Sequence, residues 1–190
     1  MNPILQRIHA DHTSALDGFL MQCGPQIEQV ASLCAKALAA GHKLMFCGNG
    51  GSACDAMHIA GEFVGRFVDD RRALPALALS ADTGILTAIA NDYAYDYIFA
   101  RQVEGLGQAG DVLLGLSTSG KSPNVLRAFE AARQKSITTV LFTGAKAEGL
   151  PPSAEHTLVV PSRITAHVQE AHMVALHGLA SLIEAELFSA

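Results

Sequence analysis

Two residues in the first half of the chain have the types and the spacing of an acid–base pair. His58 and Glu62 are four positions apart, so on a helix their side chains would lie on one face, about 6 Å from each other. A carboxylate and an imidazole placed in this way can take a proton from one atom of a substrate and return it to another. The competing interpretation is a solvated pair or an ordinary hydrogen bond.

A glycine-rich segment lies just before this pair. Residues 47–52 read Cys-Gly-Asn-Gly-Gly-Ser, and the three glycines permit positive φ and a close approach of the backbone to a ligand. Ser52 could cap a following helix whose free N–H groups face that ligand. The segment matches neither the GxGxxG of dinucleotide-binding folds nor the GK[ST] of nucleotide P-loops, and a plain tight turn is the alternative.

A second loop has the composition of a phosphate site. Residues 117–122 read Ser-Thr-Ser-Gly-Lys-Ser, and Pro123 follows in a position that favours the first turn of a helix. Four hydroxyls and the unpaired N–H groups of a helix N-terminus form a neutral cradle for a phosphate dianion. A solvated loop is the alternative. Two such loops predict a phosphorylated small molecule, and neither offers the acidic Mg²⁺ ligands that phosphoryl transfer requires.

The end of the chain carries several more polar side chains on one apolar helical stretch. They are His167, Gln169, Glu170, His172 and His177. Their spacing alone does not choose among them, because a histidine on an apolar helix is more often packed in a core than bound to a ligand.

Short apolar runs alternate with helical stretches and must position these groups. Runs at 43–47, 76–79, 112–116, 138–142 and 157–160 suit strands that are buried on both faces. Helices are expected at 53–67, 83–90, 95–106, 123–134 and 166–187. This alternation predicts an α/β fold, a three-layer αβα sandwich with a five-stranded, mainly parallel sheet. Ligands then bind in the loops at the carboxyl ends of the strands.

The N-terminal part has a different pattern. Apolar residues between Ile4 and Ala40 recur at intervals of three and four, which predicts two helices broken near Gly24 and Pro25. We therefore expect a single domain over 1–190, with 1–41 as an N-terminal helical extension.

Composition excludes several classes of protein. Of 190 residues, 49% are apolar and 16% charged, with a formal net charge of -5, which argues against disorder and against nucleic acid as the main ligand. No apolar stretch is long enough to span a membrane. Four cysteines without a CxxC pair predict reduced thiols in a cytoplasmic protein. The apolar excess suggests a subunit interface in addition to a core.

Two segments carry a resemblance to a known family. Residues 116–126, Leu-Ser-Thr-Ser-Gly-Lys-Ser-Pro-Asn-Val-Leu, resemble the phosphosugar signature of sugar isomerase (SIS) domains. Residues 46–67 are similar to the corresponding segment of the phosphoheptose isomerases, and the similarity extends over nearly the whole chain. The resemblance implies the SIS fold and the conversion of D-sedoheptulose 7-phosphate to D-glycero-D-manno-heptose 7-phosphate through an enediol.

The same resemblance implies roles for individual residues. The acid–base pair matches Glu62 and His177. The implied zinc ligands are His58, Glu62, Gln169 and His177. The implied substrate contacts are Asn49, Gly50, Gly51, Ser52, Glu62, Asn91, Asp92, Ser117, Thr118, Ser119, Ser122 and Gln169. For Ser52, and for Asp55 nearby, helix capping and dipole compensation explain the residue type about as well.

Two physical points bear on the zinc set. Its nitrogen and oxygen donors suit Zn²⁺, but Gln169 and His177 are separated by roughly 12 Å along one helix and about 80° around it, so only extended side chains could share an ion. A carboxylate held as a ligand also has a lowered pKa and accepts a proton less readily. Metal and proton transfer compete for Glu62, and zinc could be catalytic, structural or inhibitory.

The chain departs from the family pattern at one place and leaves alternatives open. Many members have an acidic and a basic residue before the active-site Gln, where this chain has Ala166 and His167. The alternatives are a non-catalytic SIS-type regulator that binds a phosphosugar or a replication initiator, and an isomerase of another ketose phosphate. The resemblance further implies a homotetramer serving heptose synthesis for lipopolysaccharide or capsule, with no nucleic-acid or membrane partner.

Overall fold

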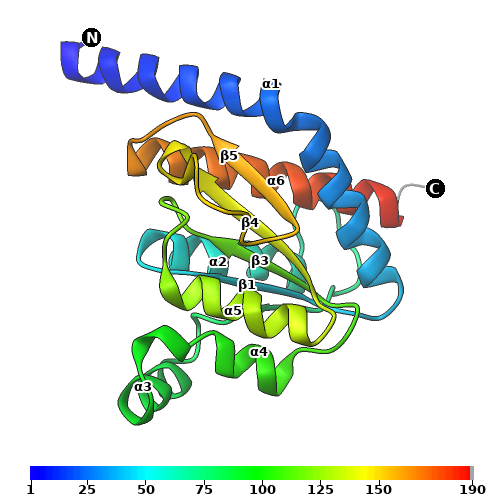
Figure 1. The fold of residues 1–190 in the computed structure, drawn as a ribbon. Helices are drawn as coiled ribbons and strands as arrows, with labels where there is room; N and C mark the ends of the chain where they lie inside the picture. The colour runs from blue at the N-terminus through cyan, green and yellow to red at the C-terminus, as the bar shows by residue number, and fades with distance from the viewer. Residues whose placement is uncertain (189–190) are drawn as a thin grey trace.

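Five short strands form one parallel sheet (Figure 1). The computed structural model describes residues 1–188. The strands are β1 (Leu44–Gly48), β2 (Ala76–Ala78), β3 (Val112–Leu116), β4 (Thr138–Gly144) and β5 (His156–Val160). Their spatial order is β2-β1-β3-β4-β5, and every neighbouring pair is parallel. The predicted α/β class is confirmed, and the sheet is wholly rather than mainly parallel.

Helices cover both faces of this sheet. The α-helices are α1 (Pro3–Ala39), α2 (Gly51–Val64), α3 (Thr83–Asp92), α4 (Ala100–Leu106), α5 (Pro123–Gln134) and α6 (Thr165–Phe188), and the two 3₁₀ turns are η1 (Tyr95–Tyr97) and η2 (Ala145–Ala147). The expected helix over 95–106 is divided between η1 and α4. The other expected helices after the first strand agree with the structure to within a few residues at their ends.

Alternate residues of each central strand enter two separate cores. Phe46 and Leu114 pack with α1, α2 and α6 on one face, whereas Met45 and Leu113 pack with α4 and α5 on the other. All five residues of β1 and of β3 are buried. A strand buried on both faces needs an unbroken apolar run, which is why these strands were predictable.

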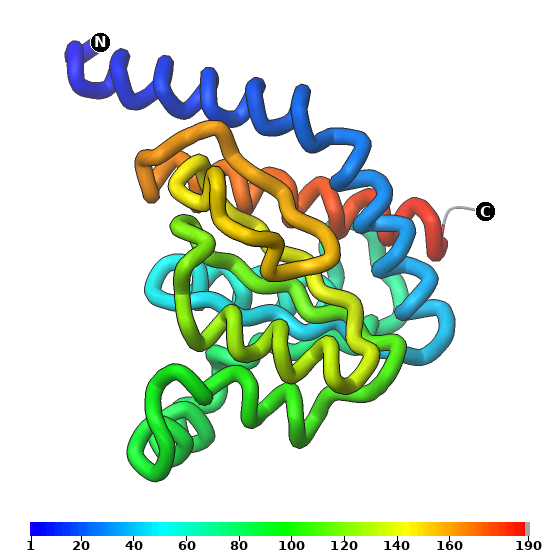
Figure 2. The backbone as a smooth tube through the Cα atoms, viewed as in Figure 1, coloured from blue at the N-terminus to red at the C-terminus, as the bar shows by residue number. Residues whose placement is uncertain are grey.

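The first helix corrects one prediction. Instead of two helices broken near Gly24 and Pro25, α1 is continuous from Pro3 to Ala39 with Pro25 inside it, and Figure 2 shows it bending part-way along its length. Proline removes one helical hydrogen bond and usually kinks a helix. Buried Phe19, Cys23 and Ile27 continue one stripe across this point, so packing along α6 and β5 holds both halves.

The loops that follow the strands meet at one edge of the sheet. In Figure 1 the strands β1 and β3 both run toward the left of the view, where α2, α5 and α6 begin. This is the edge at which parallel α/β sheets bind ligands.

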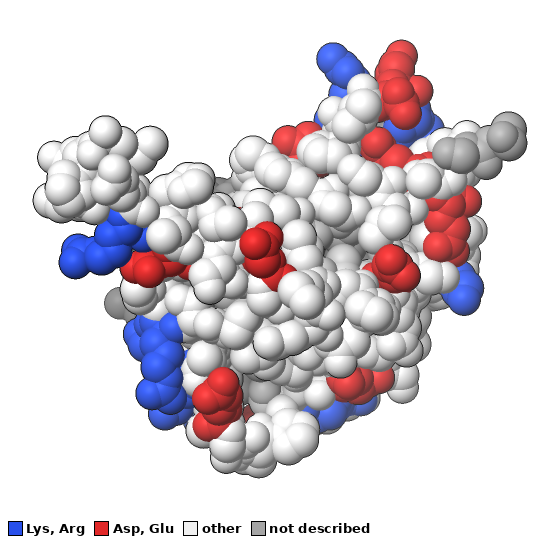
Figure 3. Space-filling model, turned by 90° about the horizontal axis from the view of Figure 1, so that it is seen from above, with Lys and Arg blue, Asp and Glu red and all other residues white. Residues whose placement is uncertain are grey.

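The surface and the cysteines agree with the composition. Seen from above, charged side chains are scattered over a mostly uncharged face (Figure 3). Among residues 1–188, no helix has the length and apolar character that crossing a membrane requires. All four cysteines are free thiols, and burial raises the pKa of Cys34 and Cys47 to about 12, so both stay protonated near neutral pH.

Candidate active site

The loop between β1 and α2 presents backbone at the edge of the sheet. Gly50 has a φ of 59° and is the N-cap of α2, with no side-chain capping bond. The prediction that Ser52 caps α2 is therefore wrong; it lies buried in the first turn. A Cβ on Gly51 would lie 2.5 Å from Nε2 of Gln169. The absence of a side chain at Gly51 therefore lets the Gln169 amide rest directly against the backbone.

A reciprocal amide pair fixes Asn49 in this loop. Nδ2 of Asn49 donates to Oδ1 of Asn124 at 2.9 Å, and Nδ2 of Asn124 donates back to Oδ1 of Asn49 at 2.8 Å. The Tyr95 hydroxyl also donates to Oδ1 of Asn49, at 3.0 Å. Asn124 is buried at the start of α5. The two loops singled out in the sequence are thus joined side by side.

The loop between β3 and α5 gathers hydroxyls at the start of a helix. The Ser117 and Ser122 hydroxyls are 2.9 Å apart, and Ser122 is the N-cap of α5 without a side-chain capping bond. Oγ of Ser119 accepts from the Lys121 N–H at 3.2 Å. Thr118 is half-buried beside them. This arrangement supplies the hydroxyl and N–H donors that an anion requires.

Three of the predicted catalytic and metal residues meet at one nitrogen. Nε2 of His58 lies 3.2 Å from Oε1 of Glu62 and 3.1 Å from Nε2 of His177. His58 and Glu62 come from α2 and His177 from α6, where its ring also stacks on Phe67 at 5.3 Å. The ligand atoms of the trio lie within 4.8 Å of one another. Neighbouring ligands of a tetrahedral zinc are separated by roughly 3.3 Å, so the donor set and its spacing fit that ion.

Gln169 lies apart from this trio. Its Nε2 is 3.5 Å from Oγ of Ser52, at the start of α2. No hydrogen bond between described residues joins it to His58, Glu62 or His177. The structure therefore groups three of the four expected zinc ligands, and the fourth lies toward the glycine-rich loop.

Asp55 occupies an unusual position between these groups. It is half-buried, and its Oδ2 has no hydrogen-bond partner within residues 1–188. Burial raises the pKa of this carboxyl, and the positive charge that His58 can carry lowers it. Asp55 lies beyond the first turn of α2, so capping does not explain it.

Asn91 and Asp92 were expected to line the sugar. Both are exposed at the end of α3, where Nδ2 of Asn91 donates to Oδ1 of Asp92 at 2.8 Å. In the part of the chain that the structure describes, neither side chain bonds to the two loops. Their contact with a substrate stays a prediction.

His172 is the packed histidine that the sequence allowed. It is fully buried, its Nε2 lies 3.2 Å from the Thr143 carbonyl, and its ring packs edge-on to Phe142. Burial lowers its pKa to about 4, against a smaller raising effect of the Thr143 carbonyl. The ring is neutral at pH 7, and it packs in the core between α6 and β4.

Sequence reasoning missed a buried ion pair behind the site. Nε of Arg71 lies 2.8 Å from Oε1 of Glu184, and both side chains are buried. Nη2 of Arg71 donates to the Glu62 carbonyl at 2.7 Å and Nη1 to the Phe63 carbonyl at 2.8 Å. Arg71 thereby holds the C-terminal end of α2, the turn that carries Glu62. The sequence around Arg71, with Asp69 and Asp70 just before it, does not indicate this role, because its partner Glu184 is 113 residues away.

The chain is similar to known proteins over almost its whole length. The family model of the SIS domain matches residues 10–144. The phosphoheptose isomerase of Geobacter sp. (strain M21) is 50% identical over 182 residues, which cover 96% of this chain and 93% of that protein. The chain belongs to the phosphoheptose isomerase family. Phosphoheptose isomerases from Neisseria gonorrhoeae and Francisella tularensis have the same fold, with TM-scores of 0.86 and 0.81.

The phosphoheptose isomerase family resemblance therefore extends beyond the loops. The two solved structures are 37% and 33% identical, cover 95% and 94% of this chain, and are themselves covered to 97%. The SIS match contains both loops, His58 and Glu62 but ends before α6. The alignment with the Geobacter protein is long enough to include α6 up to His177.

Proposed function

We propose that this member of the phosphoheptose isomerase family converts D-sedoheptulose 7-phosphate to D-glycero-D-manno-heptose 7-phosphate through an enediol. The observation that carries the proposal is the meeting of His58, Glu62 and His177. Two of them lie on α2, which starts in the glycine-rich loop that is bonded to the start of α5. The relatives are phosphoheptose isomerases by name. The protein is an isomerase of this family, and in this proposal Glu62 and His177 supply its acid and base.

The phosphate of the substrate binds in the loop before α5. Hydroxyls of Ser117, Thr118, Ser119 and Ser122 donate to its oxygens, together with free N–H groups of the helix start. This explains why an acidic chain can hold a dianion without a basic patch. The sugar extends from there toward the glycine-rich loop, where the proposed contacts are Asn49, Gly50, Gly51, Ser52, Gln169, Asn91 and Asp92.

Glu62 and His177 divide the proton transfers. One takes a proton from a carbon next to the carbonyl and returns it to the neighbouring carbon, while the other exchanges protons with the two oxygens. They come from different helices and are bridged by His58. A substrate at the sheet edge can therefore be approached by an acid and a base at once.

The resident metal in this proposal is one zinc ion per chain, held by His58, Glu62 and His177. Gln169, whose amide lies against Ser52, would have to turn toward the trio to serve as the fourth ligand. Bound zinc would polarise the substrate carbonyl or hold the site together. Glu62 cannot serve fully as base and as ligand, because coordination lowers its affinity for a proton.

We also propose a cytoplasmic homotetramer that supplies heptose for surface polysaccharide. Supporting the assembly, Ile4, Leu5 and Ile8 in the N-terminal half of α1 are 61%, 56% and 42% exposed, a stripe that a second copy could cover. Size-exclusion chromatography with light scattering measures this state, and a monomer would contradict it.

The decisive test of the reaction is incubation with D-sedoheptulose 7-phosphate in deuterated water, followed by NMR with and without a chelator. Conversion with deuterium at the carbon that gains a proton supports the enediol and the proposed substrate. No conversion at any metal content would overturn the proposal in favour of a phosphosugar-binding regulator. The dependence on chelator reports the role of zinc separately.

A further inference from the structure

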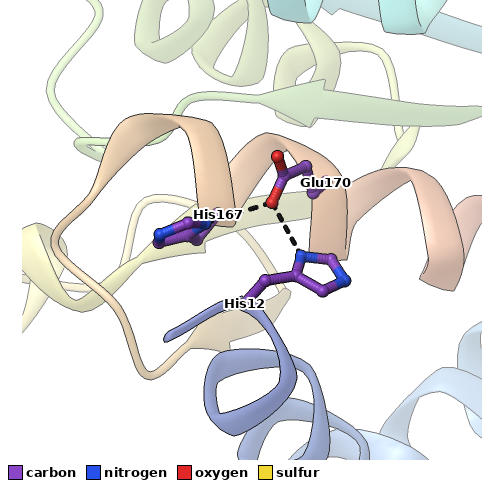
Figure 4. A group of neighbouring side chains, drawn as sticks. All are labelled: His12, His167 and Glu170. Atoms are coloured by element: carbon purple, nitrogen blue, oxygen red, sulfur yellow. Dashed lines mark hydrogen bonds and ion pairs between the residues drawn. The ribbon is translucent and has the colours of Figure 1, made fainter. Parts of the chain in front are cut away.

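Outside the candidate active site, a second group of metal-type ligands lies between two helices (Figure 4). His12 comes from α1, and His167 and Glu170 come from the first turns of α6. One ligand atom of each lies within 4.8 Å of the others. Two imidazoles and a carboxylate form a donor set that suits Zn²⁺ and neighbouring divalent transition metals.

Both rings face the same carboxylate oxygen. Nδ1 of His12 is 2.7 Å and Nδ1 of His167 is 3.1 Å from Oε2 of Glu170. Around a tetrahedral zinc the ligand atoms are separated by roughly 3.3 Å, because each bond is about 2.0–2.1 Å long. Small side-chain rotations would therefore open this group enough to admit an ion.

The burial of the three side chains is graded in a way that suits a site open on one side. The His167 side chain is 7% exposed, His12 32% and Glu170 45%. Burial fixes the inner imidazole, while the exposed carboxylate gives an ion a path from solvent and leaves room for water as a further ligand.

This group is separate from the one around His58. His167 and Glu170 are three positions apart on α6 and face α1, whereas Gln169 faces the start of α2. His12 precedes Ala15 and Phe19, which continue the buried stripe of α1, so its ring points toward α6 (Figure 4).

We propose that His12, His167 and Glu170 bind a second divalent metal ion of the zinc class, which ties α1 to the first turns of α6. Its ligand Glu170 directly follows Gln169 in the sequence. It therefore anchors the end of α6 that carries Gln169. The alternative is that two ring N–H groups simply donate to the carboxylate and no ion binds.

The test counts zinc per full-length chain by equilibrium dialysis against buffered Zn²⁺ and metal analysis. A His58→Gln/His177→Gln double variant removes two ligands of the first group. In that background we expect one zinc to remain. Adding His12→Gln should weaken it by at least the roughly tenfold that loss of an outer-shell partner costs. Adding His9→Gln should leave it in place, since His9 is exposed on the same helix and outside the group.

Three outcomes would overturn the proposal. Absence of zinc in the double variant, or equal zinc with and without His12→Gln, would overturn the proposal. If His9→Gln caused the same loss of zinc as His12→Gln, the ion would belong to a surface pair of His9 and His12 on α1, and the proposal would also be overturned. Glu170→Gln provides a second variant if His12→Gln does not fold by circular dichroism. When Co²⁺ replaces Zn²⁺, the double variant should show the visible absorption bands of a four-coordinate site. Adding His12→Gln should abolish these bands.

Discussion

Glu62 and His177 lie on different helices and meet through a single nitrogen of His58. Glu62→Gln keeps the size of the side chain but removes its ability to accept a proton. We expect unchanged folding and a turnover lower by about 10²–10⁴, measured as conversion of D-sedoheptulose 7-phosphate. Glu130→Gln, at an exposed position of α5, is the matched control and should keep full activity. Near wild-type turnover in Glu62→Gln would mean that the pair is wrongly assigned.

Gly51 offers a test of how Gln169 is positioned. A methyl group at Gly51 would meet the far end of the flexible Gln169 side chain, which can move aside. We therefore expect Gly51→Ala to change the free energy of unfolding by less than about 1 kcal/mol, yet to reduce activity by displacing the amide. Gly61→Ala, with open space around its Cβ, should keep activity. Normal kinetics in Gly51→Ala would show that activity does not depend on the position of the Gln169 amide against residue 51.

Predictability at the residue scale follows the distance between partners in the chain. The pairing of His58 with Glu62 could be predicted because it depends only on helical spacing. The contacts of Asn49 with Tyr95 and Asn124 join positions 46 and 75 residues apart. No local pattern specifies them, because they depend on how strands β1 and β3 are placed side by side.

At the scale of elements, the strands could be predicted because they are buried on both faces. The continuity of α1 could not, because it depends on tertiary packing. Apolar runs marked β1, β3 and β4 because only such runs fit between two helical layers. Gly24 and Pro25 predicted a break in the first helix, and the local preference was real, since the helix bends. Tertiary contacts of Cys23 and Ile27 with the core outweigh it.

The segment after α2 is held by the buried pair of Arg71 and Glu184. Glu184→Ala leaves the guanidinium buried without a counter-ion, which typically costs about 3–5 kcal/mol. We expect this loss in urea unfolding, together with lower activity, because Arg71 also bonds to the Glu62 carbonyl. Glu186→Ala, two residues further along, removes only an exposed hydrogen bond from Ser32 and should change the free energy of unfolding by less than about 1 kcal/mol. Equal stability of both variants would show that the pair is not a support.

For the whole molecule, the apolar composition has two structural explanations. One is the sheet buried on both faces, which the sequence already indicated. The other is the outer face of α1, where apolar side chains remain exposed in a single chain. The sequence could indicate an excess of apolar residues but could not locate it. Buried and exposed apolar residues of α1 follow the same helical spacing, and only the packing of the chain distinguishes them.

The acid stability of the whole molecule should depend on His172. Its pKa is lowered to about 4 in the folded chain and is about 6.5 when unfolded. The unfolded chain therefore binds the proton first, so the free energy of unfolding falls between about pH 6.5 and pH 4, by up to about 3 kcal/mol from this group. Above pH 7 the two states bind no proton here and the contribution is constant.

His172→Gln keeps a side-chain N–H that can bond to the Thr143 carbonyl but cannot titrate. Urea unfolding at a series of pH values should therefore show a shallower loss of stability below pH 6.5 in this variant than in the wild type. His9→Gln, at an exposed site, should follow the wild-type curve. If His172→Gln keeps the wild-type slope, other groups must cause the acid sensitivity. If it flattens the slope, one buried ring next to β4 sets how far the fold tolerates acid.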